Sequence, residues 1–438
     1  MDSESKFNTD PVDQAKVFHW QIRKIKEVVY IKGRIGWKGL KKTEFGREGT
    51  LIINGPNLES GKVKWSECLR VPEWRFLESK EISIQEKDIL LTKDGTIGKT
   101  AFVEKLPEPA TLASGIFLLR SKNEKILLPK FLYAYLSSRF FTNFVLERVE
   151  GSVIPHLYQR DIEEIYIPVP PIGEQKAIAK ILSDLDSKIE LNQKMNKTLE
   201  AIAQAIFKHW FIDFEFPNEE GKAYKSSGGE MVHSELGKIP KGWAIRKIKD
   251  FCVSIENGGT PKRMEKRYWN GNINWFKTGE LSDRPLLESE EKITEEGLRN
   301  SSCKLWKINT VLIALYASPT VGRMGILKVD GTSNQACSGL VARKEIGYSF
   351  LFYTLFFKRE EFNRIAIGAA QQNIGQEIVK ETLCIQPSRD LLDNFNSIAD
   401  RLLQKQTMLA KDQATLSLLR DSIMPKLLSG KIRVPLEE

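Results

Sequence analysis

A glycine-rich stretch in the first third of the chain has the outline of a phosphate-binding loop. It reads Ile89-Leu-Leu-Thr-Lys93-Asp-Gly95-Thr-Ile-Gly98-Lys99-Thr100. A true phosphate loop needs a glycine five positions before its last glycine, and that position here is Lys93. The next residues favour a strand rather than a helix, and a second version ending Gly322-Arg323 lacks the lysine. We therefore predict two tight hairpins with basic tips, at Lys93, Lys99 and Arg323, and no nucleotide site.

Basic residues with nearby aromatics gather in two segments. Residues 16–48 hold ten Lys/Arg against three acids, and residues 241–269 hold eight against three. This pattern fits a phosphate-backbone partner, although a solvated basic surface is the ordinary alternative. In the second segment, Gly258 and Gly259 could let backbone N–H groups approach a phosphate. The predicted DNA contacts are Trp37, Lys38, Lys41 and Lys42 in the first segment, Lys262, Arg263, Lys266, Arg267 and Lys277 in or just after the second, and the hairpin tips Lys93, Lys99 and Arg323. We interpret Trp275 as structural.

Two further loops match each other, Gly151–Leu157 and Gly368–Ile374. Gln and Asn side chains can pair bidentately with adenine in the major groove. An equally good interpretation is a turn that docks a globule on a helix. The candidate DNA contacts in these loops are Ser152, His156, Gln371, Gln372 and Asn373.

Nothing in the sequence supports catalysis by this chain. The five cysteines are scattered and never spaced as Cys-x-x-Cys, which favours a reducing, cytoplasmic location over disulfides or zinc. The four histidines lie far apart. There is no Asn-Pro-Pro-aromatic methyltransferase motif, no nuclease-type acidic cluster and no apolar run near 18 residues, so we expect no membrane span. We expect no cofactor or metal in this chain.

The elements that must carry these loops occur twice. Trp20-Gln-Ile-Arg-Lys-Ile-Lys-Glu27 returns as Trp243-Ala-Ile-Arg-Lys-Ile-Lys-Asp250, and Thr96-Ile-Gly-Lys99 returns as Thr320-Val-Gly-Arg323. The chain is therefore predicted to hold two copies of a unit, each a mixed α/β globule followed by a long helix. Two repeats are too few for a solenoid, so a pseudo-symmetric pair is expected.

The long helices are predicted from a seven-residue apolar beat that requires a partner helix. The first helix opens at Pro170-Pro171 with Glu174 in its first turn, and it would be roughly 55–60 Å long. A polar residue in such a seam, here Asn192, commonly fixes register. The seam residues are Ile178, Leu185, Asn192, Leu199 and Ile206 in the first helix, and Phe395, Leu402, Leu409, Leu416 and Ile423 in the second.

These elements predict six segments. They are a disordered stretch (1–13), a first globule (14–169), a long helix (170–216), a glycine- and serine-rich linker (217–235), a second globule (236–388), and a second long helix with a tail (389–438).

The same residues resemble a known family. PPIGEQKAIAKIL, LEAIAQAIFKHWFIDFEFP and LLRDSIMPKLLSGKIRV resemble the conserved regions of type I restriction–modification specificity subunits. GGTPKRMEKRYWNGNINW and RIGWKGLKKTEF resemble openings of that family's target recognition domains. The resemblance covers the chain after residue 14. The second long helix departs from the pattern, because its start at Pro387-Ser-Arg-Asp lacks the PPxxEQ motif.

The resemblance implies an α+β fold, with two mixed α/β target recognition domains in a pseudo-twofold arrangement. They would be joined by two long helices that form an antiparallel coiled coil. Each domain would read half of a bipartite site in double-stranded DNA. The helices would set the spacer and dock two modification subunits, which use S-adenosylmethionine, and two restriction subunits, which use ATP and magnesium. This chain would be non-catalytic. The alternatives are a stand-alone DNA-binding or coiled-coil scaffold and a fused methyltransferase or NTPase.

Overall fold

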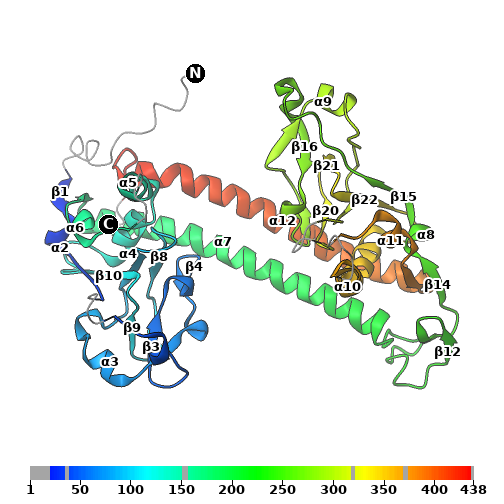
Figure 1. Cartoon of the computed structure of the whole chain (residues 1–438), viewed down its shortest axis with the longest axis horizontal. Helices are drawn as coiled ribbons and strands as arrows, with labels where there is room; N and C mark the ends of the chain where they lie inside the picture. Colours follow the sequence, from blue (N-terminus) through cyan, green and yellow to red (C-terminus); the bar gives the residue numbers. More distant parts are fainter. Residues whose placement is uncertain (1–19, 35–38, 150–155, 317–320, 368–372, 436–438) are drawn as a thin grey trace. The chain divides into compact units, whose positions relative to one another are not determined.

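The computed structural model describes residues 20–34, 39–149, 156–316, 321–367 and 373–435 (Figure 1). The predicted disordered segment 1–13 lies outside these residues. The chain divides into two compact units, one made of Met1–Ile189 with Thr415–Glu438 and the other of Glu190–Ala414. Both boundaries between the units fall inside the long helices α7 (Ile172–Phe207) and α12 (Arg389–Leu428). No helix in the described residues is long and apolar enough to cross a membrane.

The first unit is built on a four-stranded antiparallel sheet. Its order is β2-β10-β7-β8, with bounds β2 Val29–Gly33, β10 Ile116–Ser121, β7 Ile89–Thr92 and β8 Thr100–Phe102. Side chains alternate between faces along a strand. Ile89 and Leu91 therefore enter one core while Leu90 enters another, and all three are fully buried. This double burial explains why β7 is apolar at every position but its last.

The second unit repeats this arrangement. Its main sheet has the order β15-β22-β19-β20-β17, with bounds β15 Cys252–Asn257, β22 Cys337–Ala342, β19 Val311–Ala314, β20 Met324–Leu327 and β17 Arg284–Leu286. Val311 and Ile313 enter one core, and Leu312 and Ala314 enter another.

Each unit also has a three-stranded sheet that contains one parallel pair. In the first unit β3 (Thr50–Ile53) lies between β6 (Leu69–Val71) and β9 (Ala110–Leu112), and it is parallel to β9. In the second unit β16 (Trp269–Phe276) lies between β18 (Glu291–Ile293) and β21 (Gly331–Ser333), and it is parallel to β21. The common topology supports the interpretation that the two globules are copies.

In each globule a small two-stranded sheet joins a strand near the start of the globule's sequence to a strand near its end. β1 (Gln21–Lys24) pairs with β11 (Tyr166–Val169), and β14 (Ala244–Lys247) pairs with β23 (Leu383–Gln386). A carboxylate bridges two lysines beside each pair. Glu164 bonds Lys24 and Lys26, and Glu381 bonds Lys247 and Lys249. These hydrogen bonds lower the pKa of each carboxyl to about 2.

The helix that follows the main sheet differs between the two units. In the first unit it is broken into α4 (Pro129–Leu136) and α5 (Arg139–Val149), because Ser137 and Ser138 cap the first piece with side-chain and backbone bonds to its last carbonyls. In the second unit α10 (Tyr348–Ile367) is continuous. The first long helix ends in a π-helical turn at Lys208–Ile212, and the second ends at Leu428, before the predicted tail.

The segment 217–235, predicted as a linker, is folded. The rings of Phe216 and Tyr224 stack 4.6 Å apart. Asn218 accepts from the backbone of Glu220 and Lys222 at 3.0 and 2.9 Å. Its end forms a hairpin of β12 (Met231–Ser234) and β13 (Gly237–Pro240). The polar composition reflects a hydrogen-bonded turn on an aromatic base, rather than a flexible tether.

The remaining elements are short. They are α2 Ile25–Val28, η2 Lys42–Glu44, η3 Gly55–Asn57, β4 Leu58–Glu59, β5 Lys62–Val63, η4 Trp65–Glu67, α3 Glu73–Leu77, η5 Lys80–Ile82, α6 Gln159–Glu163, α8 Ile248–Phe251, η7 Lys266–Tyr268, η8 Thr278–Glu280, α9 Glu295–Arg299 and α11 Gln376–Glu381.

The predicted seam residues face inward to different degrees. Ile178, Asn192, Phe395 and Leu409 are buried, and the other six are half-buried. The prediction missed a second buried row displaced by three or four residues, which comprises Leu182, Ile189, Ala203, Ala399 and Gln406. Within the second unit, Asn192 donates to Asp412 at 2.7 Å and Gln406 donates to Glu200 at 3.1 Å. Within the first unit, Arg420 donates to Asp186 at 2.8 Å.

An amide side chain, buried in the first unit and half-buried in the second, fastens each long helix to its globule. Gln175 accepts from the backbone N–H of Leu128 and donates to the carbonyls of Ile126 and Pro170, each at 2.8 Å. In the second unit Asn396 accepts from Phe350 N–H at 3.1 Å and donates to Ile346 at 2.8 Å. Both amides therefore hold the segment that begins a globule helix, α4 or α10.

Candidate nucleic-acid interface

The two glycines of the second globule pack against its own backbone. Gly258 N–H donates to Cys337 O at 3.0 Å, and Gly259 N–H donates to Ser333 O at 2.8 Å. A Cβ on either glycine would collide with neighbouring atoms. The suggestion that these N–H groups approach a phosphate is therefore wrong, because both already have acceptors. Gly258 instead allows the loop after β15 to lie directly on Ser333 and Asn334, and Gly259 allows it to lie directly on Ser302 and Cys303.

Arg263 is held against the protein surface rather than offered to a ligand. Its guanidinium lies 3.9 Å from the ring centre of Trp269 and 4.8 Å from that of Trp275. It also forms an ion pair with Glu291 of β18, whose pKa this hydrogen bond lowers. Trp275 is 2% exposed and donates to Gly259 O at 2.8 Å, which confirms its structural role.

Two more of the predicted cations are paired. Arg267 lies 3.1 Å from Glu296 and 3.3 Å from Glu265, and Glu296 raises its pKa. Lys277 lies 2.8 Å from Glu290, and hydrogen bonding to that carboxylate raises its pKa. In contrast, Lys262 and Lys266 are exposed, and neither side chain has an ion pair within the described residues. The structure thus separates the predicted basic cluster into braced cations and available ones.

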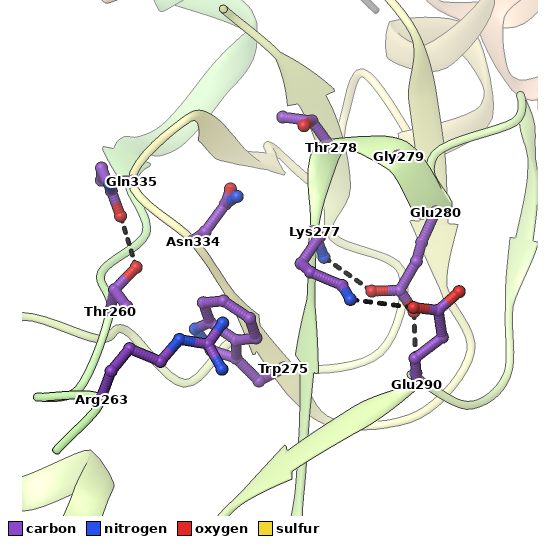
Figure 2. A pocket seen from close by; sticks show the side chains of 10 residues that line it. All are labelled: Thr260, Arg263, Trp275, Lys277, Thr278, Gly279, Glu280, Glu290, Asn334 and Gln335. Carbon is purple, nitrogen blue, oxygen red and sulfur yellow. Dashed lines mark hydrogen bonds and ion pairs between the residues drawn. The ribbon is translucent and has the colours of Figure 1, made fainter. Parts of the chain in front are cut away.

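An open cleft of about 590 Å³ lies beside this loop. Figure 2 shows Asn334 projecting into it between Lys277 and the pair Thr260–Gln335. The Thr260 hydroxyl donates to Gln335 Oε1, which orients that amide. Asn334 Oδ1 is buried without a partner in the described residues. These two amides were not among the predicted contacts, because nothing in the sequence links residue 335 to residue 260.

The basic segment of the first globule has a different structure. Trp37 and Lys38 lie outside the described residues, while Lys41 and Lys42 are exposed at the start of η2. This turn is anchored by Glu44, which accepts from Lys41 N–H at 2.6 Å and pairs with Arg75 at 2.7 Å. The two globules therefore present exposed lysines on unrelated local structures.

The loops that contain Gly98-Lys99 and Gly322-Arg323 are both hairpins. β7 and β8 are antiparallel, as are β19 and β20. Gly98 and Gly322, each with a positive φ, donate back to Thr92 and Ala314 at 3.0 and 2.9 Å. A strand rather than a helix follows each turn, so the predicted hairpins are confirmed. Lys99 is exposed, whereas Lys93 and Arg323 are half-buried.

The loops before the helices dock on these hairpins. Leu157 N–H donates to Lys93 O at 3.1 Å, and Ile374 N–H donates to Leu315 O at 2.9 Å. His156 Nδ1 is hydrogen-bonded to Asp94 at the hairpin tip. Ser152, Gln371 and Gln372 lie outside the described residues, and Asn373 is half-buried. The described part of these loops therefore packs on the hairpins, and these contacts test neither the predicted base contacts nor the predicted docking on a helix.

No group of three or more His, Cys, Asp or Glu side chains that could hold a metal ion occurs in the described residues. The four buried cysteines comprise Cys303 and three thiols, Cys252, Cys337 and Cys384, whose pKa burial raises to about 12. Thiols of such high pKa are poor nucleophiles at neutral pH.

Two globules with one scaffold and different loops agree with a comparison with known proteins. The sequence model of one family, described as the type I restriction modification DNA specificity domain, matches residues 19–201 and 240–387. The chain belongs to this family, the specificity subunits of type I restriction–modification systems. The two matched ranges fall on the two globules and most of α7.

Relatives and a solved structure agree with this assignment. The type I restriction enzyme MjaIX specificity subunit of Methanocaldococcus jannaschii is 26% identical over 435 residues, which cover 95% of this chain and 94% of that protein. The MjaVIII specificity subunit of the same organism is 29% identical over 372 residues, or 82% of each chain. The type I S subunit of M. genitalium shares the fold, with a TM-score of 0.58 at 17% identity over 98% of both chains.

Proposed function

We propose that each globule of this specificity subunit reads one half of a bipartite DNA site. The observation that carries this proposal is the pairing of a shared scaffold with unlike loops. The sheets, the hairpins and the lysine–glutamate ion pairs beside the two-stranded sheets repeat between the copies. The exposed lysines do not repeat, because Lys41 and Lys42 lie on a 3-10 turn while Lys262 and Lys266 lie on a braced loop. A common scaffold with different loops suits two different half-sites.

The long helices would pair antiparallel and set the distance between the half-sites. Within the second unit, Asn192 contacts Asp412 and Glu200 contacts Gln406, so partner numbers fall as α7 numbers rise. In the first unit Ile178 of α7 and Leu427 and Leu428 of α12 belong to one core. These contacts support the antiparallel coiled coil that the seven-residue beat predicts.

The outer faces of the long helices would dock the modification subunits, and through them the restriction subunits. Several apolar side chains on these helices are exposed, namely Leu191, Ile202, Met408, Leu418 and Leu419. Exposed apolar groups of this kind are typical of protein interaction sites. The S-adenosylmethionine, ATP and magnesium used by the complex would belong to those partners, and this chain would supply recognition without catalysis.

Exchange of one globule tests the proposal. Residues 236–388 are replaced by the matching segment of a relative that recognises a different site, and the methylated motif is mapped in cells that also express the modification subunit. We expect one half of the motif to change while the other half and the gap remain. A change in both halves would show that the globules do not read separately.

A further inference from the structure

Met264 carries the most exposed large apolar side chain in the described residues, at 93% exposure. It lies in the loop between β15 and η7, two residues after Lys262 and two before Lys266. A side chain with this exposure contributes no burial to the fold. Its position therefore needs an explanation other than stability.

The chain on both sides of Met264 is fixed. On one side, Arg263 is sandwiched with Trp269 and Trp275 and paired with Glu291. On the other side, Glu265 N–H donates to Lys262 O at 3.1 Å, and Tyr268 N–H donates to Glu265 O at 2.9 Å. The loop therefore presents Met264 from a preorganised backbone, which reduces the entropy cost of binding.

The charges around Met264 suit nucleic acid. Lys262 and Lys266 are exposed and have no ion pair in the described residues. The nearest acid in sequence, Glu265, lies 3.3 Å from Arg267 and is thus partly neutralised. An apolar tip between two available cations matches an apolar base stack between two phosphate backbones.

We propose that Met264 is a wedge that inserts between neighbouring base pairs of the half-site read by the second globule. Lys262 and Lys266 then contact the flanking phosphates. Methionine is among the side chains that DNA-bending proteins use in this way, and pyrimidine–purine steps unstack most easily. The wedge rests on the proposed function, because it acts within one of the two half-sites.

The described residues next to the exposed lysines of the first globule carry no side chain like Met264. Beside Lys41 and Lys42, the apolar residues Leu40 and Phe45 pack against the core that contains Ile52 and Val71. The proposed unstacking therefore concerns the half-site of the second globule, and the other half-site serves as an internal reference.

The test uses the full chain assembled with its modification subunits, on a duplex that carries the methylated motif mapped for the wild-type complex. The fluorescent base 2-aminopurine replaces each adenine in turn, except the methylated one. We expect fluorescence to rise at one position in the second globule's half-site with the wild-type chain and with Met264→Leu. Met264→Ala should abolish this rise and bind about tenfold more weakly, as expected for removal of one buried apolar side chain.

The matched control is Val253→Ala, which truncates another exposed apolar residue of the same globule (68% exposed) and should behave as wild type. Unchanged fluorescence and affinity in Met264→Ala would overturn the wedge. A loss of subunit assembly with normal DNA unstacking would instead assign Met264 to a protein contact and also overturn it. If the wild-type complex has no separable half-sites, the proposed function itself fails, which is a different result.

Discussion

At the scale of single residues, charge was predictable from the sequence but availability was not. From the sequence, the four cations between positions 262 and 267 were equally good candidates for DNA contacts. Two of them, Arg263 and Arg267, are paired with Glu291 and Glu296, which lie 28 and 29 residues later on β18 and α9. Only the fold brings those carboxylates near, so no local pattern could separate the braced arginines from the free lysines.

The two free lysines should dominate the salt dependence of binding. The double variant Lys262→Ala, Lys266→Ala should lower the slope of log affinity against log salt by about two units, because each phosphate that a lysine neutralises adds about 0.9 to that slope. The measurement is a salt titration of DNA binding by the assembled complex. A matched control is Lys222→Ala with Lys241→Ala, because these exposed lysines pair with Glu220 and Glu230 outside the loop. Equal slopes for the two double variants would show that the loop does not touch phosphate.

At the scale of elements, the seven-residue beat predicted both long helices and half of their seam. In the other half, the apolar Leu182 and Ile189 were overlooked, whereas Ala203, Ala399 and Gln406 were invisible because they are small or polar. Such residues give no apolar signal, although their spacing of four from the predicted row is what a paired helix requires. The PPxxEQ motif shows that sequence patterns can also miss a conserved structural role. The second long helix lacks the motif, but it is still fastened to its globule by an amide side chain.

That role is to fasten a long helix to a globule, and Gln175 performs it in the first unit. Asn396 performs it in the second, although the 217-residue offset of the seam would place the equivalent at Leu392. Asn396 lies one helical turn further along α12. The function of the motif is therefore preserved by a different residue at a different position, which no comparison of aligned letters would find.

Replacing Gln175 with Ala should destabilise the first unit. The change leaves Leu128 N–H and the carbonyls of Ile126 and Pro170 without their partner in a site that is 0% exposed. Unsatisfied buried groups cost about 1–3 kcal/mol each, so we expect the free energy of unfolding to fall by about 2–4 kcal/mol if water reaches part of the site. Hydrogen exchange at the start of α4 reports it locally. Gln193→Ala, on the exposed side of the same helix, should change little. Equal effects of the two variants would remove Gln175 from this role.

At the scale of the whole molecule, the duplication was predictable from repeated sequence motifs, but the division of the chain into two compact units was not. The predicted boundaries separated globules from helices. The structure instead divides both long helices between units and places α12 from Thr415 onward in the first unit. Leu427, Leu428 and Val434 are buried in the same core as Trp20. A division of the sequence into consecutive domains could not predict this, because residues more than 400 positions apart share the core of the first unit.

The length of the helix pair should set the unread gap between the half-sites. Duplicating Thr198-Leu199-Glu200-Ala201 in α7 adds four residues, or about 6 Å of helix, close to one turn. At about 3.4 Å per base pair this is one to two base pairs. We expect unchanged half-site sequences with a gap longer by one or two base pairs, measured by mapping the methylated motif.

The same insertion also strains the seam, because four residues do not preserve a seven-residue beat. It shifts the contact of Glu200 with Gln406 relative to that of Asn192 with Asp412. Substituting Leu199→Ala without insertion provides a control for seam damage alone, and it should weaken the pair while keeping the original gap. Loss of activity on every spacing would mean that the disrupted seam prevents assembly. An active complex that keeps its original gap would show that another part of the complex sets the distance.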